Sequence, residues 1–172
     1  YSSEYMDVTV RRDGKKYSLH FRKGAPMGKK GEELIVEPTD RKQTGTTIRF
    51  KPDIEVFTDV NIPEAYYHDV LRRQAVVNAG VRFVLKVEKD GKFETTQYLY
   101  ENGIKDYVTE VAGETALTAP VMIQAERRGR DRADKKDYKL KISAAFCFSA
   151  KVNLIEYYHN SSWLEHGGAP DK

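Results

Sequence analysis

The chain has 172 residues, of which 40% are hydrophobic and 32% are charged, and its formal net charge at pH 7 is +3. This length is enough for a domain with its own core, and we expect a single domain over residues 1–172. No apolar run approaches the roughly 20 residues of a membrane-spanning helix, which excludes such a helix. The single Cys147 excludes an internal disulfide. We therefore expect a cytoplasmic protein.

Alternation of apolar and polar residues predicts that much of the chain is β-strand. The predicted strands lie over residues 4–11, 17–21, 34–36, 48–52, 81–87, 93–99, 121–125, 138–148 and 152–158. Asp13-Gly14 and Asp90-Gly91 each separate two of these strands. An Asp-Gly pair between alternating segments is typical of a tight turn, so two β-hairpins are predicted.

Two other segments carry apolar residues at helical spacing. Pro63 suits the first turn of a helix that ends at residues 78–80, and a shorter helix is predicted from Ile104 to a stop at Gly113. Strands outnumber helices, and most neighbouring strands are joined as hairpins. The predicted class is therefore α+β, with one sheet covered on one face by two helices.

Positive charge is concentrated in residues 127–141, which carry eight Lys or Arg side chains and three aspartates. The continuous polarity of this segment predicts an exposed hairpin loop that leads into a strand. Such a loop is either a solvated surface or a patch that faces phosphate groups.

The sequence lacks the common motifs of catalytic and cofactor sites. It contains no glycine-rich phosphate loop, no Cys-x-x-Cys and no Gly-x-Ser-x-Gly. His159, Glu165 and His166 are conceivable metal ligands, but no further ligand is suggested, so we expect no metal, catalytic or cofactor-binding residue. His20 and His68 fall on the polar sides of their predicted elements and are expected at the surface.

Several short motifs, taken in order, resemble the B subunit of bacterial DNA gyrase and topoisomerase IV. The motifs are DVTVRRDGK at residues 7–15, TGTTIRFKPD at 44–53, FT at 57–58, VNAGV at 77–81, YENGIKDYV at 100–108, and Asn160 with Gly167-Gly168. Each motif is short, but together they follow the family's order over nearly the whole chain.

The resemblance implies the second, or transducer, domain of this protein. Residues 1–3 would end the preceding ATPase domain, and the rest of the transducer would follow residue 172. The implied fold is ribosomal-protein-like, a mixed sheet with a left-handed βαβ crossover, although such connections are generally right-handed. The family's catalytic and ATP-contacting residues lie outside these 172 residues. ATP and Mg²⁺ are thus expected in the full-length protein, and the fragment alone is expected to be inactive.

The activity implied by the resemblance is ATP-driven passage of double-stranded DNA. The domain would relay the nucleotide state and line a DNA clamp, with the topoisomerase A subunit and a second B subunit, joined through the upstream ATPase domain, as partners. Basic residues line the family's clamp. The candidate DNA contacts are Arg72 and Arg73, on the predicted exposed side of the first helix, and Arg127, Arg128 and Arg130 of the basic loop. For the helix pair, a solvated surface is the alternative.

Some positions depart from the family pattern. Ala169-Pro170 stands where the family usually has threonine and histidine, which indicates a divergent branch and leaves gyrase and topoisomerase IV both open. Two other classes also remain open. One is a stand-alone nucleic-acid-binding domain that uses the basic run, and the other is a structural interaction domain.

Overall fold

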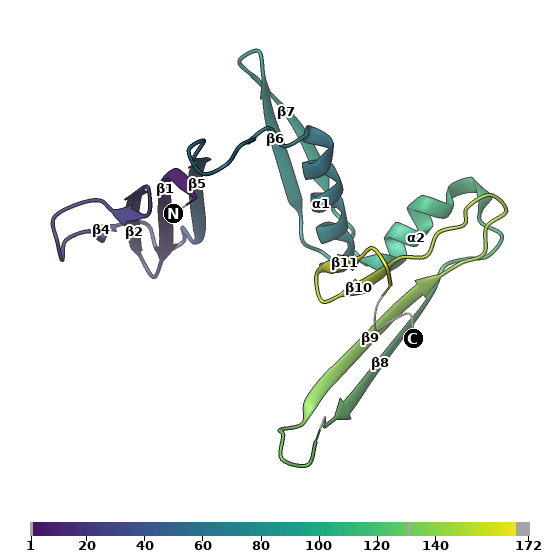
Figure 1. Ribbon diagram of the computed structural model, residues 1–172. Coiled ribbons are helices and arrows are strands. Elements are labelled where there is room, and N and C mark those ends of the chain that lie inside the picture. Colours follow the sequence, from purple (N-terminus) through teal and green to yellow (C-terminus); the bar gives the residue numbers. More distant parts are fainter. Residues whose placement is uncertain (1, 131, 168–172) are drawn as a thin grey trace. The chain divides into compact units, whose positions relative to one another are not determined.

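The computed structural model describes residues 2–130 and 132–167, and its contacts divide into two compact units, Tyr1–Ile62 and Pro63–Lys172 (Figure 1). Each unit has its own secondary structure. The single domain predicted over residues 1–172 stays a prediction. The motif residue Gly168 and the departure at Ala169-Pro170 lie outside the described residues, as does Tyr1.

The first unit is an antiparallel sheet of five strands. They are β1 (Ser3–Arg12), β2 (Lys15–Arg22), β3 (Ala25–Pro26), β4 (Ile35–Pro38) and β5 (Gly45–Pro52). The strand order is β3-β2-β1-β5, with β4 also paired to β2. Asp13 and Gly14 join β1 to β2 with φ values of 55° and 75°, which is the geometry that the Asp-Gly pair predicted. Val8 pairs with Leu19 on one side and with Ile48 on the other, so the first predicted hairpin is confirmed, with apolar residues of three strands opposite one another.

Over residues 63–130 and 132–167, the second unit contains both helices and three separate two-stranded sheets. Its elements are α1 (Glu64–Val77), β6 (Phe83–Lys89), β7 (Lys92–Tyr98), α2 (Ile104–Ala112), the 3-10 turn η1 (Gly113–Thr115), β8 (Val121–Gly129), β9 (Tyr138–Phe146), β10 (Tyr157–His159) and β11 (Ser162–Leu164). The pairs are β6-β7, β8-β9 and β10-β11. Both predicted helices and the second predicted hairpin are confirmed, and within the described residues neither helix is long and apolar enough to cross a membrane.

The core of the second unit lies where α1, the β6–β7 hairpin and α2 meet. Ala75, Val76 and Tyr100 are buried, and further apolar side chains pack around them: Val77, Phe83, Tyr98, Ile104 and Tyr107. Tyr67, which helical spacing placed on the apolar face of α1, is instead 43% exposed. The C-terminal half of α1 carries the fully buried positions, because this half packs against Tyr100 and the side chains around it.

Two predictions about the strands are wrong. The single sheet is replaced by one five-stranded sheet and three hairpins, so the α+β class is confirmed but its arrangement is not. In the predicted strand over residues 152–158, the described strand begins only at Tyr157. The N–H groups of Lys151 and Val152 donate to the Ser149 hydroxyl, which occupies donors at the start of the segment that a strand ladder would use. Every strand pair in residues 2–130 and 132–167 is antiparallel, so the left-handed βαβ crossover stays a prediction.

Candidate functional site

Side chains from α1, from the end of β7 and the residues after it, and from α2 surround an open concavity of about 550 Å³ in the second unit. The lining residues are His68, Asp69, Arg72, Gln97, Tyr98, Leu99, Tyr100 and Glu110. Most of them are polar or charged, so the concavity offers hydrogen-bonding groups beside apolar surface. Both the histidine and the arginine in it come from α1.

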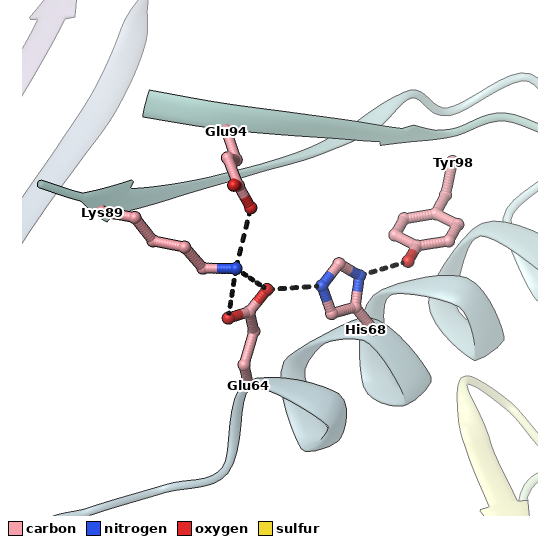
Figure 2. Close-up of polar contacts among 5 residues, drawn as sticks. All are labelled: Glu64, His68, Lys89, Glu94 and Tyr98. Carbon is pink, nitrogen blue, oxygen red and sulfur yellow. Dashed lines mark hydrogen bonds and ion pairs between the residues drawn. The ribbon is translucent and has the colours of Figure 1, made fainter. Parts of the chain in front are cut away.

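A chain of polar contacts ties the start of α1 to the β6–β7 hairpin (Figure 2). Glu64 accepts from Lys89 at 3.1 Å and lies 3.3 Å from His68 Nε2, and Lys89 also donates to Glu94 at 2.7 Å. His68 Nδ1 lies 2.6 Å from the Tyr98 hydroxyl. The bonds from Lys89 and then His68 lower the pKa of the Glu64 carboxyl. The predicted surface position of His68 is therefore wrong, since this half-buried side chain joins two elements.

Arg72 joins α1 to the chain around α2. Its Nε donates to the Tyr100 hydroxyl at 3.2 Å, its other end pairs with Glu110, and its guanidinium lies 5.5 Å from the centre of the Tyr107 ring. The bond to Tyr100 raises the pKa of Arg72, while burial raises the pKa of the Tyr100 hydroxyl. Arg72 was predicted on an exposed helix face, but its side chain is half-buried and bonded on two sides. DNA contact by Arg72 stays a prediction.

Arg73 is more enclosed than its neighbour, with a side chain that is 25% exposed. Its Nε donates to Asp69 at 3.1 Å, and its guanidinium lies 3.5 Å from the centre of the Trp163 ring in β11. The prediction that Arg73 projects from an exposed helix face is therefore wrong, and its role in DNA contact is untested. The two arginines of α1 point to two different neighbours, α2 and the β10–β11 hairpin.

The three arginines predicted from the basic run lie at the end of the β8–β9 hairpin. Arg130 pairs with Asp137 at 2.6 Å, and Arg127 donates to the carbonyl oxygen of Glu126. Arg128 lies opposite Lys139 in the strand register and is exposed, and it has no polar or ring partner among the described residues. The predicted exposed hairpin is confirmed. Among these three arginines, Arg128 has the guanidinium that is most available to an external phosphate.

Metal binding finds no support in the described ranges, 2–130 and 132–167. Within them, no group of three or more His, Cys, Asp or Glu side chains is arranged to hold an ion, and the expected absence of a metal stays a prediction. The polar contacts along α1 were missed by the sequence analysis. Two of them have a sequence signal, because Glu64 and His68, like Asp69 and Arg73, are four residues apart on a helix.

Comparison with known proteins gives relatives of one kind. No protein-family model matches the chain. The B subunit of DNA gyrase from Enterococcus faecalis is 29% identical over 171 residues, which is 96% of this chain and 24% of that protein. The B subunit of DNA gyrase from Archaeoglobus fulgidus is 31% identical over 166 residues, which is again 96% of this chain and 24% of that protein. The chain thus spans about a quarter of the length of these relatives.

Solved structures agree with the sequence relatives. The 43K ATPase domain of Thermus thermophilus gyrase B, in complex with an aminocoumarin, matches with a TM-score of 0.60 and 28% identity over 76% of this chain and 34% of that one. The topoisomerase IV ATP-binding domain of Francisella tularensis matches in fold, with a TM-score of 0.55 and 24% identity over 70% of this chain and 32% of that one. The resemblance to this family is confirmed: over nearly all of its length the chain is related in sequence to the B subunit of DNA gyrase, and in fold to the ATPase regions of gyrase B and topoisomerase IV.

Proposed function

We propose that the chain is part of the ATP-driven B subunit of a type II DNA topoisomerase, in which it relays ATP binding and hydrolysis to DNA strand passage. The similarity to gyrase B over 96% of the chain carries this proposal. The full-length protein would bind ATP and Mg²⁺ in its nucleotide-binding part. It would act in the cytoplasm with the topoisomerase A subunit, double-stranded DNA and a second B subunit.

The contacts of α1 support a relay role. Its first turn bonds to the β6–β7 hairpin through Glu64, its middle bonds to the chain around α2 through Arg72, and Arg73 contacts β11. A helix held on three sides by specific side chains moves with its neighbours as a body. Packed side chains and hydrogen-bonded contacts of this kind can carry coupling between distant sites, and they support the transducer role that we propose for the chain.

The end of the β8–β9 hairpin is the part of the chain best suited to DNA. Phosphate groups are bound by cationic side chains without regard to base sequence, and such binding weakens as salt rises. Arg128 is exposed without a side-chain partner among the described residues, whereas Lys139 and Lys141 on the same hairpin both pair with Glu126. We propose Arg128 as the main DNA contact, because Arg127 precedes it in β8 and lies on the opposite face of the hairpin, and Arg130 is tied to Asp137.

The test uses the complete reading frame that contains this chain. Its translation is expected to show a Glu-x-x-x-Asn helix and a glycine-rich lid before these residues and a Gln-x-Lys loop after them. The purified product, mixed with its A subunit, is expected to change the linking number of plasmid DNA when ATP is present. Unrelated flanking sequence, or no ATP-dependent change in plasmid topology, refutes the proposal and favours a stand-alone nucleic-acid-binding or structural domain.

The relay itself is tested by Arg72→Ala in that complete protein. We expect ATP hydrolysis to persist while the number of strand-passage events per ATP falls, because the bond between α1 and Tyr100 is lost. Arg82→Ala is the matched control, since Arg82 is exposed and has no polar or ring partner among the described residues. Equal losses of hydrolysis and strand passage in Arg72→Ala would count against a relay.

A further inference from the structure

The chain has a single tryptophan, and it lies against α1. Trp163 belongs to β11 and is half-buried, with the Arg73 guanidinium 3.5 Å from the centre of its ring. A cation attracts the face of an indole more strongly than that of any other aromatic side chain. Asp69, one turn earlier on α1, accepts from Arg73 Nε at 3.1 Å and so fixes the orientation of the guanidinium.

The next residue of α1 makes a second contact with the same hairpin. Gln74 Nε2 donates to the carbonyl oxygen of Ser161 at 2.7 Å. Ser161 lies in the turn between β10 and β11, beside Asn160, whose φ of 54° closes this turn. Two consecutive residues of α1 therefore hold two points of the β10–β11 hairpin, one at its turn and one on β11.

The same hairpin is drawn near the start of α2 in Figure 1. Tyr158, which pairs with Trp163 across the two strands, donates to Glu156 at 3.0 Å. The hairpin thus lies at the junction of the two helices that the proposed relay uses (Figure 1).

We propose that Arg73, Gln74 and Trp163 are positioning residues that fix the β10–β11 hairpin on α1, so that a displacement of α1 is carried to this hairpin. The inference rests on the proposed function for its biological meaning, but the contact itself does not. Arg73 is accordingly assigned to the hairpin rather than to DNA. We call the pairs Arg73–Trp163 and Gln74–Ser161 the hairpin contact.

Trp163 reports the hairpin contact directly, because it is the only tryptophan of the chain and its emission belongs to one site. In the 172-residue chain, Arg73→Ala is expected to shift tryptophan emission to longer wavelength and to increase quenching by acrylamide. The equilibrium constant for docking of the hairpin on α1 is expected to fall by about two- to thirtyfold, which corresponds to the strength of a cation–π pair. Gln74→Ala is expected to change the same signals in the same direction.

Controls separate loss of the contact from loss of the fold. Arg82→Ala, at an exposed arginine without a partner among the described residues, is expected to leave emission and quenching unchanged. Arg73→Lys keeps a cation near the ring and is expected to restore part of the signal. If Arg73→Ala loses helix content by circular dichroism, Arg73→Gln decides, because it keeps a polar chain of similar length without the charge. Unchanged Trp163 emission and quenching in a folded Arg73 variant overturns the proposal.

The positioning role has its own readout in the complete protein with its A subunit. Arg73→Ala is expected to lower strand passage per ATP hydrolysed while hydrolysis persists, and Arg73→Lys is expected to recover part of it. If fluorescence changes but strand passage per ATP does not, the positioning role is wrong while the proposed function stands. If the wild-type protein shows no ATP-dependent strand passage, the proposed function fails while the fluorescence result still decides the hairpin contact.

Discussion

Replacement of Gly103 by alanine is a sharp test of how α1 and α2 are joined. Gly103 is the N-cap residue that precedes α2, with φ 57° and ψ −127°, and it is buried. A Cβ at this position would lie 3.1 Å from the Cβ of Ala79 and 3.1 Å from the carbonyl oxygen of Val76, at the end of α1. The substitution therefore meets an unfavourable backbone conformation and a steric conflict with the backbone of the neighbouring helix.

Gly113 at the other end of α2 is a matched control. Its φ of 48° and ψ of −138° are close to those of Gly103, but a Cβ there would meet no atom within 4 Å. Both alanine variants carry the backbone strain, which costs about 1–3 kcal/mol. Only Gly103→Ala adds the overpacking cost of about 1–3 kcal/mol.

The free energy of unfolding, measured by urea denaturation with circular dichroism, separates the cost of backbone strain from the cost of overpacking. Gly103→Ala is expected to lose about 1–3 kcal/mol more stability than Gly113→Ala. Equal losses in the two variants would refute the inferred close contact between the start of α2 and the end of α1.

Three further predictions concern the second unit. Arg72→Ala removes the partner of the buried Tyr100 hydroxyl and of Glu110. It is expected to lower the free energy of unfolding, measured in urea, by about 1–3 kcal/mol. A loss below roughly 0.5 kcal/mol, as at an ordinary surface site, would contradict this prediction. Arg128→Ala is expected to reduce the salt slope of binding to short duplex DNA by about 0.9, the value for one phosphate contact, and an unchanged slope would exclude that contact. Burial raises the pKa of Tyr107 to about 12. The contribution of the protonated Tyr107 hydroxyl to the free energy of unfolding is therefore fully present below the unfolded-state pKa of about 10, and it is lost as pH rises from there through the folded-state pKa. In Tyr107→Phe this loss is expected to be smaller in alkaline urea titrations, and an identical pH profile would show that Tyr107 does not cause it.

Local patterns in the sequence were enough to predict both helices and the hairpins β1–β2 and β6–β7, but not the β10–β11 hairpin. The Asp-Gly turns at residues 13–14 and 90–91 specify their hairpins because a two-residue turn of positive φ fixes the register of the strands beside it. The start of α1 follows from Pro63, and the end of α2 follows from Gly113. The order of the short motifs also identified the family, which the comparisons confirm.

The buried faces of these elements, and the roles of the charged residues on them, became known only from the folded chain. Arg72 bonds to Tyr100, 28 residues away, and Gln74 bonds to Ser161, 87 residues away, and no local pattern encodes such pairs. A polar residue on a helix gives the same periodic signal whether it faces water or a partner on another element. The arginines of α1 therefore resemble a solvent-facing surface in the sequence, and they are contacts between elements because the chain returns to them from α2 and β11.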